Sequence, residues 1–366
     1  MIYIHIPFCH RKCTYCAFYS MGTQDEALRL SYIDALITEM HMRRGELGQP
    51  PRTVYLGGGT PSMLGVEGLR RIVVALRECF DTRMVEEATV ECNPEDIDAG
   101  FMAGLASLGF FNRVSIGVQS LNDDTLRLLG RRHTAAQAAD AVRVATQAGF
   151  SNISVDFMYG LPGGRMELPD PAMLYAVKHV SAYALTVEPR TALAVQVERG
   201  TVILPSDDEV AVQYHAMRQC LKDAGFEQYE VSNFCRNGFQ SLHNSRYWTR
   251  TPYLGLGAAA HSFSGDKRRW NVSNVKRYID CVSNRMPFYE EELLTDNDAF
   301  NETLMTALRT ARGLPADAIP YKHRAMVNKK MASYIACGWI TVNGGHYSPT
   351  AEGLLHADGM AADLFV

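Results

Sequence analysis

The chain has 366 residues, a formal net charge of −4 and an isoelectric point near 6.3, with 47% hydrophobic and 21% charged residues. This length suits one large barrel with an appendage, or two to three domains. The acidic balance argues against a general nucleic-acid surface, and no apolar run reaches the eighteen or so residues that a membrane span needs. Nine cysteines without a recognisable signal peptide indicate a reducing compartment, so we expect a cytoplasmic protein.

The first expected element is a strand over 2–6, and the loop after it carries three cysteines in a C-x3-C-x2-C pattern, Cys9, Cys13 and Cys16. A cubane iron–sulfur cluster normally takes four thiolates, so three would leave one iron open to a ligand from outside the protein. The amino and carboxylate groups of S-adenosylmethionine (SAM) chelate such an open iron in radical SAM enzymes. The alternative is a zinc-stabilised module that adds His5 or His10. Because no second cysteine pair follows, the spacing favours the cluster.

After this loop the chain alternates between helical and strand patterns. A long amphipathic helix is expected over 25–47, and the glycine-rich turn over 160–164 ends one of the later strands. The expected strands cover 52–56, 87–92, 113–118, 152–159 and 180–187, and the helices cover 65–80, 97–108, 121–129, 135–148, 171–178 and 207–224. Six parallel βα units in an α/β chain predict a partial, open (β/α)6 barrel, with an open doubly wound sheet as the competing layout.

The last third of the chain has a different pattern. Residues 226–290 are irregular and aromatic-rich, and we expect them to add sheet over the open side of a barrel formed by residues 1–225. Residues 291–366 predict a helical, winged-helix-like domain, with helices over 301–311 and 325–336, a hairpin turned by Asn343-Gly344 and a last helix from Ala351. Because this domain lacks a basic recognition face, a protein-binding or capping role is favoured over nucleic-acid binding.

Glycines and a carboxylate stand where the second and third strands end. In parallel barrels the carboxyl ends of the strands meet at one mouth, where ligands bind. Gly57-Gly58-Gly59-Thr60-Pro61 follows the second strand, and glycines there let the backbone approach a ligand closely. Glu91 lies at the end of the third strand and could accept both hydroxyls of a ribose. The alternatives are an ordinary turn for the glycines and a surface or capping charge for Glu91.

Further polar residues point to the same mouth. Gln119 closes the fourth strand, and Asp156 lies among apolar residues of the fifth, where an acid must be paired. Arg131 follows the fourth strand and could pair with Asp156 or with the carboxylate of SAM. Tyr3 shares a strand face with His5 because successive side chains alternate.

Together these motifs resemble those of radical SAM proteins of the oxygen-independent coproporphyrinogen III oxidase group. The matching stretches are the C-x3-C-x-Y-C loop, GGGTP at 57–61, ECNP at 91–94, SIGVQS at 115–120 and VDFMYGLPG at 155–163, and the resemblance continues through the tail. It implies a 4Fe–4S cluster ligated by Cys9, Cys13 and Cys16. It further implies SAM contacts from Tyr3, Tyr15, Gly58, Gly59, Thr60, Glu91, Gln119, Arg131 and Asp156.

Two departures separate the chain from the oxidases of this group. Those enzymes resemble C-x3-C-x2-C-x-C, whereas Phe18 stands at the position of the additional cysteine. They also carry a long extension before the cluster, whereas eight residues precede Cys9 here. Both departures argue against oxidative decarboxylation of coproporphyrinogen III, which is kept as the alternative function.

A third feature points to the heme chaperones of the same group. His243-Asn244-Ser245-Arg246-Tyr247-Trp248 matches their H-N-x-x-Y-W motif. An imidazole can ligate heme iron and aromatic rings can stack on the macrocycle, so His243 is the candidate heme ligand and His261 a weaker one. The alternative is a packed histidine that tethers a loop. The resemblance implies a protein that carries heme to an acceptor hemoprotein, as a monomer or homodimer, without nucleic acid or membrane partners.

Overall fold

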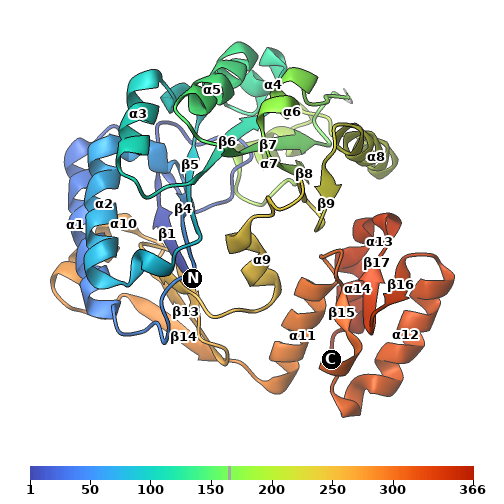
Figure 1. Ribbon diagram of the computed structural model, residues 1–366. Helices are drawn as coiled ribbons and strands as arrows, with labels where there is room; N and C mark the ends of the chain where they lie inside the picture. The colour runs from blue at the N-terminus through green and yellow to red at the C-terminus, as the bar shows by residue number, and fades with distance from the viewer. Residues whose placement is uncertain (164–165) are drawn as a thin grey trace.

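The computed structural model describes residues 1–163 and 166–366 and is built around a nine-stranded sheet (Figure 1). The strand order is β11-β1-β4-β5-β6-β7-β8-β10-β9, parallel from β11 to β8 and antiparallel beyond. The strands are β1 Ile2–Ile6, β4 Thr53–Gly58, β5 Glu87–Cys92, β6 Arg113–Gln119, β7 Asn152–Tyr159, β8 His179–Ala184, β9 Glu227–Gln228, β10 Asn233–Cys235 and β11 Leu254–Leu256. Because β1 to β8 follow chain order without a reversal, the partial barrel is confirmed and the doubly wound layout is wrong.

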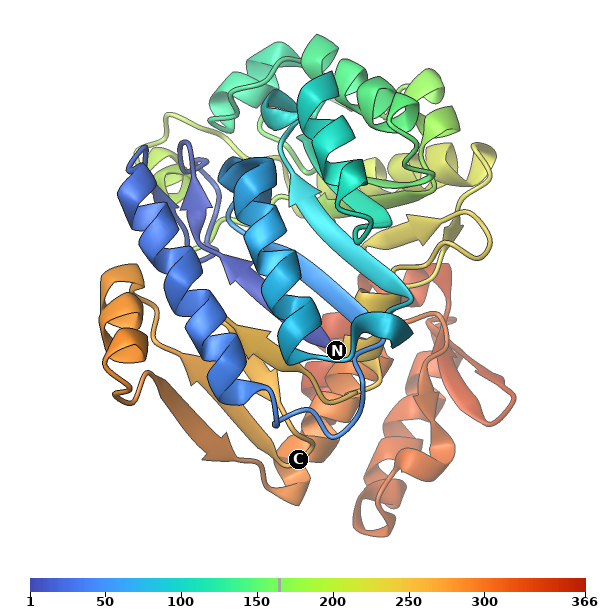
Figure 2. The ribbon, with the colours of Figure 1, turned by 60° about the vertical axis from the view of Figure 1, so that its left-hand side comes forward.

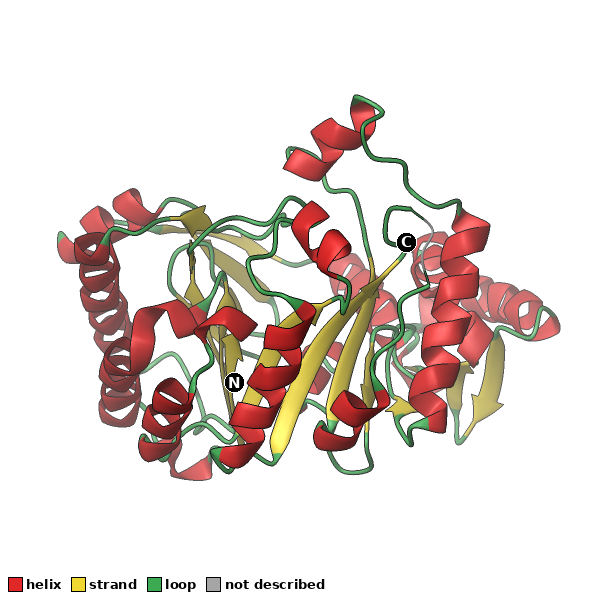
Figure 3. Cartoon of the chain, turned by 90° about the horizontal axis from the view of Figure 1, so that it is seen from above, coloured by secondary structure: helices red, strands yellow, loops and turns green. Residues whose placement is uncertain are grey.

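Helices follow the parallel strands and cover the outer face of the sheet (Figure 3). In α2 the apolar residues Leu69, Ile72, Val73 and Leu76 recur at helical spacing and are all buried. Figure 2 shows α1 and α2 side by side over the sheet. The helices of this region are α1 Glu26–Arg43, α2 Gly65–Cys79, α3 Ala99–Ser107, α4 Asp123–Leu128, α5 Ala135–Gln147, α6 Pro171–Ala176, α7 Ala192–Glu198 and α8 Asp207–Asp223. The last residue of the turn expected over 160–164 lies outside the described residues.

Residues 226–290 do not form one added sheet. The strands β9 and β10 extend the main sheet past β8, while β11 pairs with β1 at the opposite edge. A separate antiparallel sheet consists of β12 His261–Phe263, β13 Lys267–Asn271 and β14 Tyr289–Leu293. Two helices that the sequence did not reveal, α9 Leu242–Trp248 and α10 Val275–Ser283, lie between these strands. Elements this short contain too few periods of the hydrophobic pattern to be recognised.

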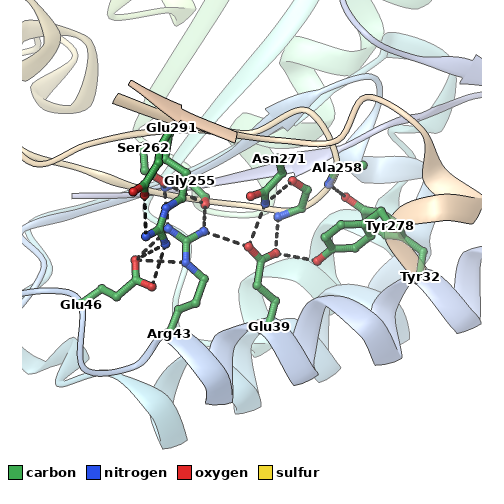
Figure 4. Close-up of polar contacts among 12 residues, drawn as sticks. Tyr32, Glu39, Arg43, Glu46, Gly255, Ala258, Ser262, Asn271, Tyr278 and Glu291 are labelled. Carbon is green, nitrogen blue, oxygen red and sulfur yellow. Dashed lines mark hydrogen bonds and ion pairs between the residues drawn. The ribbon is translucent and has the colours of Figure 1, made fainter. Parts of the chain in front are cut away.

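A buried carboxylate fastens this region to α1 (Figure 4). Glu39 is fully buried, and its two oxygens accept hydrogen bonds from Arg43 Nη1 (2.9 Å), Asn271 Nδ2 (2.8 Å), Gly257 N (2.7 Å) and Tyr278 Oη (2.6 Å). Arg43 also donates to the Gly255 carbonyl at 2.8 Å. The Glu39 carboxylate and the buried Arg43 guanidinium therefore both have hydrogen-bond partners, which a buried charge requires.

The C-terminal segment has a core of its own, formed by residues from Phe300 to Leu364. It contains α11 Asp296–Ala307, α12 Arg324–Ala336, α13 Ala351–Leu355 and α14 Ala357–Leu364, with a small sheet of β15 Leu314–Pro315, β16 Ile340–Asn343 and β17 His346–Pro349. The predicted hairpin turns at Gly344 and Gly345, which both have positive φ angles. Figure 1 shows α9 between the main sheet and this segment. In the described part of the chain, no helix has the length and apolar character to cross a membrane.

Candidate functional site

The three clustered cysteines lie in the loop that follows β1. The strand pair β2 Phe8–Cys9 and β3 Met21–Gly22 closes the base of this loop. Thr14 anchors its middle, because its backbone N–H donates to the Leu129 carbonyl at 3.0 Å and its hydroxyl donates to the Leu128 carbonyl at 3.1 Å. The loop is thus held against the C-terminal end of α4 rather than projecting into solvent.

The loop borders a cavity of about 150 Å³ at the carboxyl ends of the strands. All three cysteines line it. So do most of the residues that the sequence proposes for SAM, namely Tyr15, Gly58, Gly59, Thr60, Glu91, Gln119, Arg131 and Asp156. The fold therefore brings together groups that are up to 147 positions apart in the sequence. The donor set of three thiols beside carboxylates and half-buried glycine backbone fits a cluster and an amino-acid ligand.

Two hydrogen-bond donors face the cysteine sulfurs. The Thr60 hydroxyl donates to Cys9 Sγ at 3.5 Å, and Arg131 Nη1 donates to Cys13 Sγ at 3.6 Å. Burial raises the pKa of the Cys9 and Cys16 thiols above the usual value. Because iron binds thiolates, loading of a cluster would displace protons from these thiols, and the two donors would then stabilise the charged sulfurs.

The zinc alternative finds no support around the loop. His5 is buried, with Nδ1 3.0 Å from Tyr3 Oη and Nε2 2.8 Å from the Tyr19 carbonyl. His10 Nε2 lies 3.1 Å from Asp96 Oδ1. Both imidazoles are therefore engaged elsewhere. No three His, Cys, Asp or Glu side chains among residues 1–163 and 166–366, the three cysteines included, lie close enough together to hold a single metal ion, so the cysteine loop is linked to a cluster by its donor types and its surroundings and not by a preformed metal geometry.

Gly58 meets a strict requirement at the end of β4. Its φ angle is +110°, and a Cβ atom there would lie 2.4 Å from the ring of His5. Its backbone N–H donates to Glu91 Oε2 at 3.2 Å. Only glycine satisfies both this conformation and this close approach, so the glycine run serves packing as well as ligand access.

Glu91 lies at the end of β5 with its carboxylate in the cavity. Its Oε1 accepts a hydrogen bond from Tyr55 Oη at 2.7 Å. Burial raises the pKa of Glu91 to about 7, and the nearby charge of Asp156 acts in the same direction. A carboxylate poised in this way can accept hydrogen bonds from a pair of vicinal hydroxyls.

Asp156 and Gln119 complete the opposite wall. Burial raises the pKa of Asp156, whereas hydrogen bonds from Ser181 and Ser115 lower it. Gln119 has a φ angle of +70°, an uncommon conformation for a residue with a side chain, and its Oε1 accepts from Tyr183 Oη at 2.6 Å. The register between β6 and β7 shifts at this point. Strain of this kind often occurs at ligand sites.

Arg131 is held on the cysteine side of the cavity. Besides Cys13, its guanidinium donates to Asn93 Oδ1 and to the Gly117 carbonyl, both at 2.7 Å. Within the described residues no ion pair joins Arg131 to Asp156, so the direct pairing considered from the sequence is absent there. The buried Nε of Arg131 also has no partner among those residues, which leaves one donor for a ligand.

Eight lining residues were not proposed for the site from the sequence, namely Arg11, Phe18, Ser20, Cys92, Asn93, Ser115, Gly117 and Tyr183. Ser115 lies four positions before Gln119 on β6, so the period of two predicts the same strand face for both, whereas no predicted site residue on β8 marked the face of Tyr183. Asn93 follows β5 directly, and its Nδ2 donates to the Thr60 hydroxyl at 3.0 Å. That contact depends on the pairing of β4 with β5 and has no local signature.

Tyr3 and His243 do not line this cavity. Tyr3 packs on Tyr55 with 6.3 Å between ring centroids. His243, at the start of α9, is only 1% exposed, with Nδ1 2.9 Å from Thr53 Oγ1 and Nε2 3.0 Å from Tyr247 Oη. These are the contacts of the packed-histidine alternative, and heme ligation by His243 stays a prediction. His261 is exposed and packs on Trp270.

A second cavity, of about 660 Å³, lies between α9 and the C-terminal segment. Ser245 and Trp248 of the H-N-x-x-Y-W motif line it, together with Tyr229, Gln240, Thr249, Arg250, Thr303, Thr306, Ala307, Thr310, Ala311, Arg312, Gly313, Pro315 and Ala318. Trp248 Nε1 and Arg250 Nη2 are buried without partners among the described residues. The lining thus combines two aromatic rings, small apolar side chains, two arginines and several hydroxyl and amide side chains. The rings and the arginines suit a flat apolar molecule bearing carboxylates.

Two family models match separate parts of the chain, one in the barrel and one in the C-terminal segment. The model of the Radical SAM superfamily matches residues 3–168, and that of the HemN C-terminal domain matches residues 294–356. Among solved structures, the chain is similar to coproporphyrinogen III oxidase (HemN) from Escherichia coli, with a TM-score of 0.83 and 23% identity over 100% of this chain and 89% of that one. This likeness shows the fold.

Curated relatives are similar over nearly the whole length. Heme chaperone HemW of Mycobacterium tuberculosis (strain CDC 1551 / Oshkosh) is 34% identical, covering 99% of this chain and 94% of the relative. Heme chaperone HemW of Bacillus subtilis (strain 168) is 34% identical, covering 85% and 84%. Heme chaperone HemW of Lactococcus lactis subsp. lactis (strain IL1403) is 35% identical, covering 89% and 86%.

Proposed function

We propose that this chain, which belongs to the HemW family of radical SAM proteins, binds heme and transfers it to an acceptor hemoprotein. The relatives' name supports the heme cargo. The observation that carries the proposal is the position of α9: the helix that bears the H-N-x-x-Y-W motif forms one wall of the 660 Å³ cavity. We place the heme in this cavity, whose other wall is the C-terminal segment.

The chemistry of the lining supports this cargo. The indole of Trp248 offers a face for stacking on a porphyrin ring, and such contacts add to the free energy of apolar burial. Arg250 and Arg312 offer guanidinium groups for the two propionates. Arg250 Nε already donates to Glu302 Oε2 at 3.1 Å, whereas its Nη2 has no partner among the described residues. On the side of the C-terminal segment, the cavity is lined by three residues of α11, namely Thr303, Thr306 and Ala307. A heme bound there would therefore be released by separation of α9 from the C-terminal segment rather than through the barrel.

Cys9, Cys13 and Cys16 would hold a 4Fe–4S cluster in the first cavity, and the residues around Glu91 would hold SAM beside it. When bound, this pair supplies an electron that can cleave the sulfonium of SAM. The role of the chain itself is to fix the thiols through Thr14, to orient SAM through Glu91 and the backbone of Gly58, and to shield the site. The free thiols of all nine cysteines support a reducing, cytoplasmic location.

Anaerobic titration of the full chain with heme, followed through the Soret band, tests the proposal. We expect saturable binding and transfer of the heme to apomyoglobin as a probe acceptor. Trp248→Leu should raise the Kd for heme about tenfold, or about 1.4 kcal/mol. Trp270→Leu is the matched control, because Trp270 lies on β13 outside the cavity lining and should leave the Kd unchanged. Equal effects of both variants would contradict the site.

The alternative function is checked with the same preparation. Supplied with coproporphyrinogen III, SAM and a low-potential reductant, the protein should form no vinyl product. Phe18, at the position of the additional cysteine of the oxidases, is 71% exposed at the edge of the cysteine cavity. Formation of a decarboxylated product without saturable heme binding would overturn the chaperone proposal and favour the oxidase.

A further inference from the structure

His243 belongs structurally to the barrel although it lies in the motif associated with heme. The N-terminus of α9 lies at the amino end of β5. There the N–H groups of Leu242 and His243 donate to the buried Glu87 carboxylate at 2.9 and 2.8 Å. The imidazole then contacts two residues of β4, Thr53 through Nδ1 and Tyr55 through its ring. Because Thr53 and Tyr55 are two positions apart on one strand, they face the same side.

Tyr55 connects α9 to the cavity that the three cysteines and Glu91 line. Its ring lies between His243, at 5.1 Å between centroids, and Tyr3, at 6.3 Å. Its hydroxyl donates to Glu91 Oε1 at 2.7 Å, the shorter of the hydrogen bonds that the described residues make to that carboxylate. The direction of the Tyr55 ring, and with it the donor to Glu91, is therefore set by what packs beneath the ring.

We propose that His243 is a positioning residue of the SAM site: it fixes the ring of Tyr55, and Tyr55 in turn orients the Glu91 carboxylate toward the ribose hydroxyls. The inference rests on the proposed placement of SAM beside Glu91. Removing the imidazole leaves a space into which the Tyr55 ring can tilt, and the tilt breaks the hydrogen bond to Glu91. His243 cannot fill this role and ligate heme iron at the same time, because Thr53 and Tyr247 engage both ring nitrogens.

Equilibrium dialysis of radiolabelled SAM against the reconstituted full chain tests this role. Tyr55→Phe removes a hydrogen bond to a carboxylate and should raise the Kd for SAM about tenfold. His243→Ala should raise it by a similar factor, and the double variant should be no weaker than Tyr55→Phe alone, because both changes remove the same interaction. His243→Gln retains a donor and an acceptor and should recover most of the affinity. Additive losses, or an unchanged Kd in His243→Ala, would overturn the proposal.

The matched control is His179, a second buried histidine inside the barrel. Its ring nitrogens also meet two hydroxyls, Ser154 Oγ at 2.7 Å and Tyr229 Oη at 2.8 Å, but its ring neighbours Tyr229 rather than Tyr55. His179→Ala should therefore cost stability without weakening SAM binding as His243→Ala does. Equal losses of SAM affinity in the two variants would overturn the specific role of His243.

A crystal structure of His243→Ala gives a readout that does not depend on SAM. We expect the Tyr55 ring to be displaced and its contact with Glu91 to be broken, and an unchanged 2.7 Å contact would overturn the inference. If the wild-type chain binds no SAM, the proposed SAM site fails, whereas the position of Tyr55 still decides the role of His243. Loss of heme affinity in His243→Ala with normal SAM affinity would instead assign the imidazole to heme.

Discussion

Replacing Glu39 with glutamine should destabilise the protein by about 3 to 5 kcal/mol, the cost of breaking a buried ion pair. Each oxygen of the carboxylate accepts two hydrogen bonds, from Arg43 and Asn271 at Oε1 and from Gly257 and Tyr278 at Oε2. An amide NH2 in either position would face donors instead of accepting from them. The Arg43 guanidinium, whose side chain is 3% exposed, would also lose the partner that shares its buried environment.

Urea unfolding of the two proteins measures the loss of stability, and hydrogen exchange locates it. Exchange should accelerate in residues 254–278, which contain three of the four partners of Glu39, and should stay unchanged in the separate C-terminal core. Glu46→Gln is the control: Glu46 pairs with the same arginine but is 39% exposed, so we expect a loss of about 1 kcal/mol or less. A Glu39→Gln loss as small as that of the control would refute the assigned role of the buried carboxylate.

Three further outcomes are expected. Cys13→Ala should abolish the brown iron–sulfur absorbance after reconstitution, whereas Cys92→Ala, which lines the same cavity, should retain it; the visible spectrum decides. Because burial raises the pKa of Glu91 to about 7, this group becomes protonated as the pH falls below 7, so the Kd for SAM should rise between pH 8 and 6, and Glu91→Gln should remove this dependence in dialysis. Gly58→Ala places a methyl group 2.4 Å from the His5 ring at a φ of +110° and should lower stability by about 1 to 3 kcal/mol in urea unfolding, with a near-normal midpoint contradicting the close approach.

Long buried strands could be predicted from the sequence, and short elements could not. The strands β5 and β7 begin and end where the apolar pattern placed them, because strands buried by helices read as continuous runs. The helix α1 ends at Arg43 instead of continuing to residue 47, and the Arg43 side chain donates to Glu39 within the helix and to the Gly255 carbonyl outside it. The Gly255 carbonyl lies 212 positions from Arg43 in the sequence, so no local pattern predicts that contact.

For the candidate site, the sequence predicted which residues come together but not how their side chains are oriented. The order of strands and loops was enough to assemble the cysteines with Glu91, Gln119 and Asp156, since strand ends converge in any such barrel. The direction of individual side chains was not accessible. The sequence allows Arg131 to pair with Asp156, yet its guanidinium lies against Cys13 and Asn93. For His243 the motif spacing could not reveal that the ring faces β4.

The pairing of β1 with β11 determines when, during translation, the surroundings of the cysteine loop can be completed. The cysteine loop follows the first strand to leave the ribosome, but one flank of that strand is covered only by residues 254–256. The loop itself waits for α10, since the Val275 N–H donates to Tyr19 Oη at 2.9 Å. At translation rates of about 5 to 20 residues per second, roughly 12 to 50 s separate the making of the cysteines from the completion of their surroundings. Under the proposed ligation, stable cluster loading would therefore follow the synthesis of residue 275, although the cysteines are made first.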